Sequence, residues 1–476
     1  MSLSEQARHL VDRVIENNEW RQRRCFNLIP SENTPSLLVK VMEISDPSGR
    51  YAEHRTMKGK EVYFYQGIDF IRDIEEMARE EMCKYFEAPR AEMRAVSGQM
   101  ANEVVFKAVT NFGNRKREEG QPWRRIRSVM NNDLTKGGHL SSQPMGALFN
   151  FVDHREDGKE NVTNFPIRAD NLYKTDTDAL GNLLQEARPE LIIFGKSMFI
   201  YREPVQFVHD VVKDWDPRPI IMYDMAHVLG LYGAFQEPFR EGADIVTGST
   251  HKTFFGPQRG VIASTIEKKT PLSKLWIDIK SRVFPGSTSN HHLGTLLALL
   301  MATYEMNAFK TEYQTQVCRN AKAFAKALKE AGLDVQGDPA DGYTETHQVL
   351  LRVSEYGPGD QIARRLEENN IVCNYQALPD DESFLVSSGL RTGVSEMTRF
   401  GMKEEDFGPL AQLIADCVIR DKNVKDEAAE YRKQFSTMHY CLAADEAAEL
   451  AARVFSSVFP SSEYAKIFAE NLSRLV

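Results

Sequence analysis

The sequence has no apolar run of membrane-spanning length, and its first ten residues lack the apolar core of a signal peptide. Its six cysteines are scattered without a CxxC spacing, a pattern that predicts reduced thiols and neither disulfides nor a zinc site. The formal net charge of −9 argues against a surface that binds nucleic acid. We therefore expect a cytoplasmic protein with neither a membrane nor a nucleic-acid partner.

The remaining composition is that of an ordinary globular protein, with 42% hydrophobic and 27% charged residues among 476. We expect an N-terminal arm, a large domain, a smaller C-terminal domain and a helical extension, over residues 1–50, 51–310, 311–423 and 424–476. Apolar residues at helical spacing predict four long helices, over residues 4–27 (with Ser4 as N-cap), 69–86, 293–306 and 311–331.

Short apolar runs surround a cluster of polar residues between positions 219 and 264. The first run, Ile220–Tyr223, ends at Asp224, and a later run leads into Thr250-His251-Lys252. The alternation of such runs with helical stretches predicts an α/β fold with a mostly parallel sheet. Functional side chains are expected at the carboxyl ends of such strands.

Lys252 lies in a tight, hydroxyl-lined turn between two predicted strands. A lysine there is either a surface residue or an amine that forms a Schiff base with a carbonyl cofactor, once its surroundings lower its pKa. Asp224 could pair with the pyridinium nitrogen of pyridoxal phosphate, and His227 and His251 bracket the same site. These neighbours favour the cofactor interpretation.

The segments Tyr223–Val228 and Thr250–Thr253 resemble the cofactor-binding segment of the serine hydroxymethyltransferase family. The resemblance extends from about residue 25 to about residue 420. It implies a fold-type I pyridoxal-phosphate enzyme, with a mostly parallel sheet in a large domain, a smaller α+β C-terminal domain and a helical N-terminal arm. It also implies aldol chemistry at the Cα–Cβ bond of β-hydroxy-α-amino acids, with Lys252 as the lysine that carries the cofactor.

Further motifs extend the resemblance to the cofactor site. Gly137–Leu140 resembles the family's GGHL, in which the histidine stacks on the cofactor ring. A Ser-Gly turn that opens a helix can bind a phosphate, and residues 94–102 resemble the family's phosphate cup. The positions that the resemblance assigns to cofactor binding are Ser97, Gly98, Gln99, His139, Ser197, Asp224, His227, Thr250, His251, Lys252, Ser289 and Asn290.

The resemblance also assigns the substrate side of the site. Arg391, in a stretch that resembles TSGLRIGT, would bind the substrate α-carboxylate, for which a planar guanidinium is well shaped. Ser31, after a proline, is either a helix cap or a second contact to that carboxylate. Glu53 would move a proton on and off the substrate oxygen, as the chemistry requires, and Tyr51 and Tyr65 would lie beside it.

In the family, the residues at the positions of Glu53 and of Ser289 and Asn290 reach into the neighbouring subunit, so we expect a homodimer with shared active sites. Ser289 and Asn290 stand where the family has two glycines. The adjacent His291 and His292 would point to different helix faces, and no metal site is predicted.

Two departures from the family pattern leave the reaction open. The chain is about four residues longer after Glu53, and His54 replaces a usual glycine. Tyr375 and Gln376 stand in the stretch that matches the pterin-binding NKNxVP. The candidates are hydroxymethyl transfer from serine to tetrahydrofolate, and a folate-independent threonine aldolase or transaldolase that joins glycine to an aldehyde. Another pyridoxal-phosphate enzyme, such as an aminotransferase, and a catalytically silent interaction protein are the remaining alternatives.

Overall fold

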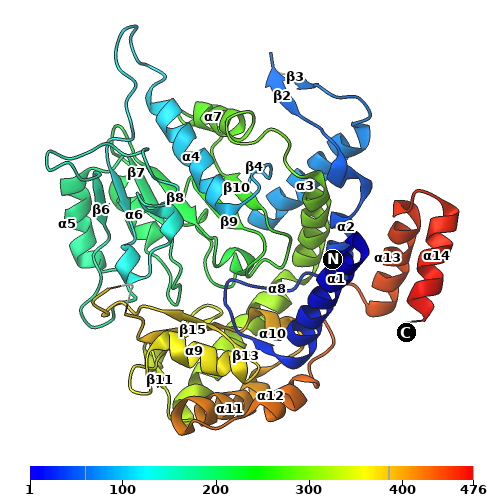
Figure 1. Cartoon of the computed structure of the whole chain (residues 1–476). Coiled ribbons are helices and arrows are strands. Elements are labelled where there is room, and N and C mark those ends of the chain that lie inside the picture. Colours follow the sequence, from blue (N-terminus) through cyan, green and yellow to red (C-terminus); the bar gives the residue numbers. More distant parts are fainter. Residues whose placement is uncertain (59, 384–385, 475–476) are drawn as a thin grey trace.

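A seven-stranded sheet forms the centre of the larger part of the molecule in the computed structural model, which describes residues 1–58, 60–383 and 386–474 (Figure 1). The strand order is β4-β10-β9-β8-β7-β5-β6, and β10 runs antiparallel to both of its neighbours while the other pairs are parallel. The predicted mostly parallel sheet is confirmed. Its strands are β4 (Arg90–Glu92), β5 (Val129–Asn131), β6 (Val162–Asn164), β7 (Leu191–Phe194), β8 (Ile220–Asp224), β9 (Ile245–Ser249) and β10 (Gly260–Ser264).

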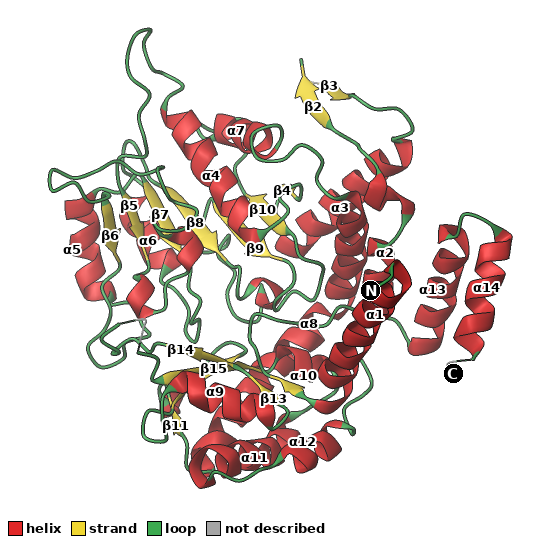
Figure 2. Ribbon diagram, viewed as in Figure 1, coloured by secondary structure: helices red, strands yellow, loops and turns green. Residues whose placement is uncertain are grey.

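Helices cover both faces of this sheet, which is why its central strands are continuous apolar runs. Alternate residues of β8 belong to different clusters, Ile221 and Tyr223 to one and Ile220 and Met222 to the other. The first cluster includes apolar residues of α5 (Thr177–Ala187) and α6 (Val205–Val212), and the second those of α4 (Gly98–Gly113) and α7 (Ser273–Val283). Figure 2 shows the resulting layers of helix, sheet and helix.

A smaller antiparallel sheet lies below the first in Figure 1, in the order β11-β12-β15-β14. Its strands are β11 (Asp334–Val335), β12 (Gln348–Arg352), β14 (Asn374–Gln376) and β15 (Gly389–Gly393), with helices α9 (Gly359–Glu368), α10 (Ser395–Arg399) and α11 (Phe407–Arg420). A short parallel pair of β1 (Phe26–Asn27) and β13 (Ile371–Val372) joins the N-terminal segment to this part of the fold.

One 38-residue helix, α8 (Leu293–Glu330), connects the two parts. The prediction of two helices, over residues 293–306 and 311–331, was therefore wrong, and our proposed boundary at residue 310 falls inside α8. The intervening Asn-Ala-Phe-Lys contains no proline or glycine, so nothing in it ends a helix. The side chain of Asn307 donates outward to the carbonyl and carboxylate of Glu81 instead of competing for the helix backbone.

The N-terminal helix α1 (Leu3–Glu19) begins and ends earlier than predicted. Ser2, not Ser4, is its N-cap, because Ser2 and Glu5 form a reciprocal capping box. A π-helical turn over Trp20–Arg24 follows, and the chain then becomes extended where the Phe26 amide bonds to the Asn370 carbonyl at 2.9 Å. None of the side chains of α1 is buried.

The remaining helices and strands come from the N-terminal part and the end of the chain. The predicted helix over residues 69–86 is confirmed as α3 (Asp69–Phe86), and α2 (Leu37–Glu43) and the hairpin of β2 (His54–Met57) and β3 (Lys60–Tyr63) precede it. At the end of the chain are α12 (Lys425–Arg432), α13 (Ala444–Val458) and α14 (Ser462–Ser473), with α13 packed on α2 through an apolar cluster. No helix in the described ranges is both long and apolar enough to cross a membrane.

Candidate active site

Asp224 ends strand β8 at the carboxyl edge of the large sheet, with 1% of its surface exposed. Its Oδ2 atom accepts hydrogen bonds from Nδ1 of His139 at 2.6 Å and from Nδ2 of Asn102 at 2.8 Å. Burial raises the pKa of the Asp224 carboxyl, but His139 and these hydrogen bonds outweigh it and hold the pKa below its ordinary value. The site therefore contains a fixed carboxylate that stays ionised near neutral pH.

Lys252 lies in the turn after β9, with its Nζ atom 3.5 Å from Oγ of Ser249. Burial lowers the pKa of the Lys252 amine to about 8, while Asp224 opposes this shift and Arg391 adds to it. A neutral lysine amine is a nucleophile, whereas an ammonium is not. The environment of Lys252 therefore raises the share of the neutral, reactive amine near neutral pH.

Two distant side chains hold the backbone of this turn. Nδ2 of Asn33 donates to the Lys252 carbonyl at 3.0 Å, and Oη of Tyr313, on α8, donates to the Thr253 carbonyl at 2.8 Å. Asn33 also donates to the Tyr313 hydroxyl at 3.3 Å. These bonds fix the direction in which the Lys252 side chain leaves the turn.

Two histidines border the lysine. The His227 ring lies edge-on to the His139 ring, with centroids 5.2 Å apart. Burial, followed by the charge of Lys252, lowers the pKa of His227 well below its ordinary value and that of His251 to about 4. Within the described part of the chain, Nδ1 of both rings is buried without a hydrogen-bond partner. Both rings are therefore neutral.

Arg391 projects from β15 of the smaller sheet and is 8% exposed. It donates to the Ser197 carbonyl at 2.7 Å and to Oδ1 of Asn374 at 3.2 Å. No carboxylate of residues 1–58, 60–383 or 386–474 pairs with it, and burial lowers its pKa to about 10. A buried guanidinium without an anion is costly unless a ligand supplies one, so Arg391 is a ready site for a carboxylate.

The N-terminus of α4 lies beside the lysine turn. Ser97 caps the helix by accepting a bond from the Met100 amide at 3.1 Å, and Gln99 is exposed. A Cβ atom at Gly98 would lie 2.0 Å from Oγ of Ser249, which itself lies 3.5 Å from Nζ of Lys252. Only glycine allows this approach, which brings the free amides of the helix end near the lysine.

Two further predicted residues lie on turns next to the site. The turn of Ser31 packs on the end of β15, where the Gly393 amide donates to the Leu28 carbonyl at 2.7 Å. The hydroxyl of Thr250 is fully buried and donates to the Pro257 carbonyl at 2.6 Å. Thr250 therefore shapes the turn of Lys252 through its side chain.

The other five predicted residues form a separate group. The rings of Tyr51 and Tyr65 lie 5.2 Å apart, and Nδ2 of Asn290 donates to the Arg50 carbonyl at 2.7 Å. Among the described residues, no hydrogen bond, ion pair or ring contact joins this group to Lys252, Asp224 or Arg391. Its members are Tyr51, Glu53, Tyr65, Ser289 and Asn290.

The sequence interpretation did not single out Asn102, Asn33 or Tyr313. Asn102 follows the predicted phosphate turn by about one helical turn, which was a usable signal. Asn33 and Tyr313 are 280 positions apart, so no sequence spacing could have paired them. Within the described ranges, no group of three or more His, Cys, Asp or Glu side chains is arranged to hold a metal ion.

Comparison with known proteins identifies the family. The serine hydroxymethyltransferase family model matches residues 3–414. The chain is 37% identical to a serine hydroxymethyltransferase from Archaeoglobus fulgidus, over 92% of this chain and 93% of that protein, and 38% identical to one from Methanothermobacter thermautotrophicus, over 91% and 95%.

A solved structure shares the fold. The L-threonine transaldolase from Pseudomonas fluorescens superposes with a TM-score of 0.78 at 26% sequence identity, over 94% of this chain and 98% of that one. The predicted fold-type I architecture is confirmed. The chain is thus a pyridoxal-phosphate-dependent enzyme of hydroxymethyl-transfer or aldol chemistry, and it belongs to the serine hydroxymethyltransferase family.

Proposed function

We propose that Lys252 forms a Schiff base with pyridoxal phosphate and that the site cleaves and forms the Cα–Cβ bond of β-hydroxy-α-amino acids. One observation carries the proposal: a lysine amine with a pKa of about 8, an ionised Asp224 and Arg391 share one buried site. Among the described residues, no carboxylate pairs with Arg391. When bound, the cofactor supplies an electron sink for the pair released as the bond breaks. The residues around Lys252 suit the cofactor. Asp224 can bind the cationic ring, and the N-terminus of α4 can bind the phosphate.

Each group has a distinct task in this proposal. Asp224, fixed by His139 and Asn102, binds the protonated ring nitrogen, and His139 and His227 border the ring. Arg391 binds the substrate α-carboxylate, and Ser31 on the adjoining turn adds a contact to it. Ser97, Gly98 and Gln99 bind the phosphate at the start of α4.

The separate group of Tyr51, Glu53, Tyr65, Ser289 and Asn290 acts in the site of a second subunit. Two features support this homodimer. Within the described residues, no hydrogen bond, ion pair or ring contact joins the group to Lys252, Asp224 or Arg391 of its own chain. Helix α1 also leaves Leu10, Val11, Val14 and Ile15 between 49% and 65% exposed, a stripe that a second copy would cover.

The depressed pKa of Lys252 makes a testable prediction about cofactor binding. The rate of covalent attachment of pyridoxal phosphate to the apoprotein should rise as pH rises through about 8 and then level off, because the neutral amine reacts. An unperturbed lysine would level off only above about pH 10. Stopped-flow absorbance between pH 6 and pH 10 measures this profile, and a rate that still rises at pH 10 without levelling off would contradict the proposed environment.

Hydroxymethyl transfer is the first candidate for the overall reaction, and folate-independent transaldol chemistry is the second. The relatives named serine hydroxymethyltransferase support the first. The fold-level match to a threonine transaldolase supports the second, as does Tyr375, which is 52% exposed on β14 beside the Arg391-bound Asn374.

Measuring glycine release from serine and from threonine, with and without tetrahydrofolate, separates these candidates. Release from serine that requires folate indicates the hydroxymethyltransferase. Release from threonine that ignores folate, and reverses when an aldehyde is added, indicates the aldolase or transaldolase. If neither amino acid yields glycine but a 2-oxo acid regenerates the cofactor, the enzyme is an aminotransferase and the proposal is wrong.

A further inference from the structure

Buried polar groups connect the turn of Lys252 to helix α8, beginning at Arg259. The Arg259 carbonyl accepts from the Thr250 amide at 3.0 Å, and its guanidinium is fully buried. Nη1 donates to the carbonyls of His291 and His292 at 2.5 and 2.9 Å, and Nη2 lies 3.2 Å from Nδ1 of His291. Arg259 therefore joins the start of the lysine turn to the residues that follow Ser289 and Asn290.

The contacts of His291 determine which of its nitrogens carries hydrogen. A guanidinium can only donate, so Nδ1 of His291 accepts from Arg259. Nε2 then carries the hydrogen and donates to Oε1 of Glu75, on α3, at 2.7 Å. Burial, followed by the charge of Arg259, lowers the pKa of His291 well below its ordinary value, in agreement with a neutral ring.

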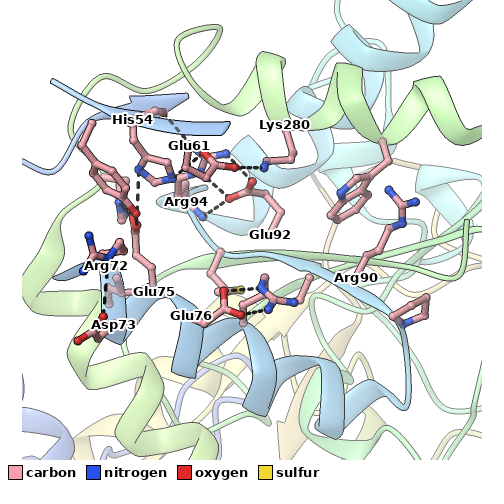
Figure 3. A pocket seen from close by; sticks show the side chains of 18 of the residues that line it. His54, Glu61, Arg72, Asp73, Glu75, Glu76, Arg90, Glu92, Arg94 and Lys280 are labelled. Carbon is pink, nitrogen blue, oxygen red and sulfur yellow. Dashed lines mark hydrogen bonds and ion pairs between the residues drawn. The ribbon is translucent and has the colours of Figure 1, made fainter. Parts of the chain in front are cut away.

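Glu75 continues the connection to the segment that contains Glu53. Its Oε2 accepts from the Tyr63 hydroxyl at 3.2 Å and lies 3.5 Å from Nδ1 of His54. His54 directly follows Glu53 and stacks on the Tyr63 ring, with centroids 4.4 Å apart. Figure 3 shows Glu75 below His54 at the edge of a cavity of about 890 Å³.

We propose that Glu75 and His291 are positioning residues, which hold the Glu53 segment and the Ser289–Asn290 segment in one fixed relation. Glu75 bonds to His291, which follows Asn290, and to Tyr63, which pairs with His54 next to Glu53. Asn290 also donates to the Arg50 carbonyl, close in sequence to Glu53. This inference rests on the proposed function, in which both segments serve the neighbouring site. Neither residue touches the substrate; they act through Glu53 and Asn290.

The expected effect is on the chemical step and on cofactor affinity. Displacing a catalytic group by about 1 Å can lower a rate by about 10²-fold. Removing the Glu75 carboxyl should therefore displace Glu53, which lowers kcat. It should also displace Asn290, which weakens cofactor binding. The KM for the amino acid should change little, because Arg391 lies outside this network.

The test compares Glu75→Ala with Glu75→Gln and a matched control, Glu76→Ala. Glutamine has the same length as glutamate and keeps a side-chain oxygen that can still accept from His291. Glu76 lies on the same helix, is exposed, and forms an ion pair with Arg79. Glu75→Ala should lower kcat by about tenfold or more and raise the Kd for pyridoxal phosphate, with KM within about twofold. Glu75→Gln and Glu76→Ala should both stay near the wild type.

His291→Leu, which removes the same bond from the other side, keeps the proposal testable if Glu75→Ala does not fold. A folded variant of either kind with kcat and cofactor Kd within twofold of the wild type would overturn the positioning role. A parallel fall in kcat and rise in KM, not rescued by Glu75→Gln, would also overturn it. If the wild type itself cleaves neither amino acid, the proposed function fails, and the cofactor Kd of the apoproteins still decides the role of Glu75.

Discussion

Lys252→Ala is expected to abolish covalent attachment of pyridoxal phosphate and to lower the rate of amino-acid cleavage by about three orders of magnitude or more. The variant loses the buried lysine amine whose pKa is near 8, the nucleophile of the proposed attachment. The purified protein should lack the visible absorbance of a lysine-bound cofactor. Borohydride reduction followed by peptide mass spectrometry should label the peptide with Lys252 in the wild type alone.

Lys252→Arg is the matched control, since it keeps the positive charge but cannot form a Schiff base. It should lose attachment as fully as Lys252→Ala. Lys196 is an alternative amine, because it directly precedes Ser197, which is assigned to cofactor binding. Its Nζ lies 2.5 Å from Oε1 of Glu203 and donates to the Tyr173 carbonyl at 3.0 Å, so it is held away from this role. Reducible label on Lys196 in the Lys252→Ala variant would contradict our assignment.

The presence of Asp224 and Lys252 in one site could be predicted from the short apolar runs of the sequence. Both residues follow buried apolar runs, and the carboxyl ends of neighbouring parallel strands meet at one edge of a sheet. The structure pairs β8 with β9 in parallel, with Asp224 opposite Thr247, so the two side chains approach from adjacent strands. The apolar runs of the sequence and the parallel pairing of β8 with β9 therefore both place the two residues at one edge of the sheet.

The side chains that hold the site in place through hydrogen bonds could not be predicted in the same way. Tyr313 bonds to the Thr253 carbonyl from the middle of α8, and its position depends on the continuity of that helix across residues 307–310. The sequence pattern predicts one helix on either side of these residues, whereas packing continues a single helix through them. Glu75 has the spacing of the buried face of α3, between Ile71 and Ala78, but only the packed structure brings His291 and Tyr63 to its two oxygens.

The separation of Glu53 from the lysine cluster was expected only from the family resemblance, and it leads to the second large effect. A dimer of Lys252→Ala subunits lacks the amine in both sites, and a dimer of Glu53→Ala subunits lacks the acid–base carboxyl in both. A mixed dimer, however, has one site in which Lys252 of one subunit meets Glu53 of the other. Co-expression with two different affinity tags isolates this species, which should regain about half of the wild-type activity per dimer.

A matched control replaces the Lys252→Ala subunit by a double variant with both changes. A mixed dimer of this subunit with Glu53→Ala contains one intact lysine but no Glu53, so it should remain inactive. If the single-variant mixture is as inactive as its parents, Glu53 serves its own subunit or another residue transfers the proton. Recovery would instead mean that one active site needs two chains, and that the group of Tyr51, Glu53, Tyr65, Ser289 and Asn290 lies away from Lys252 because its site is in the partner.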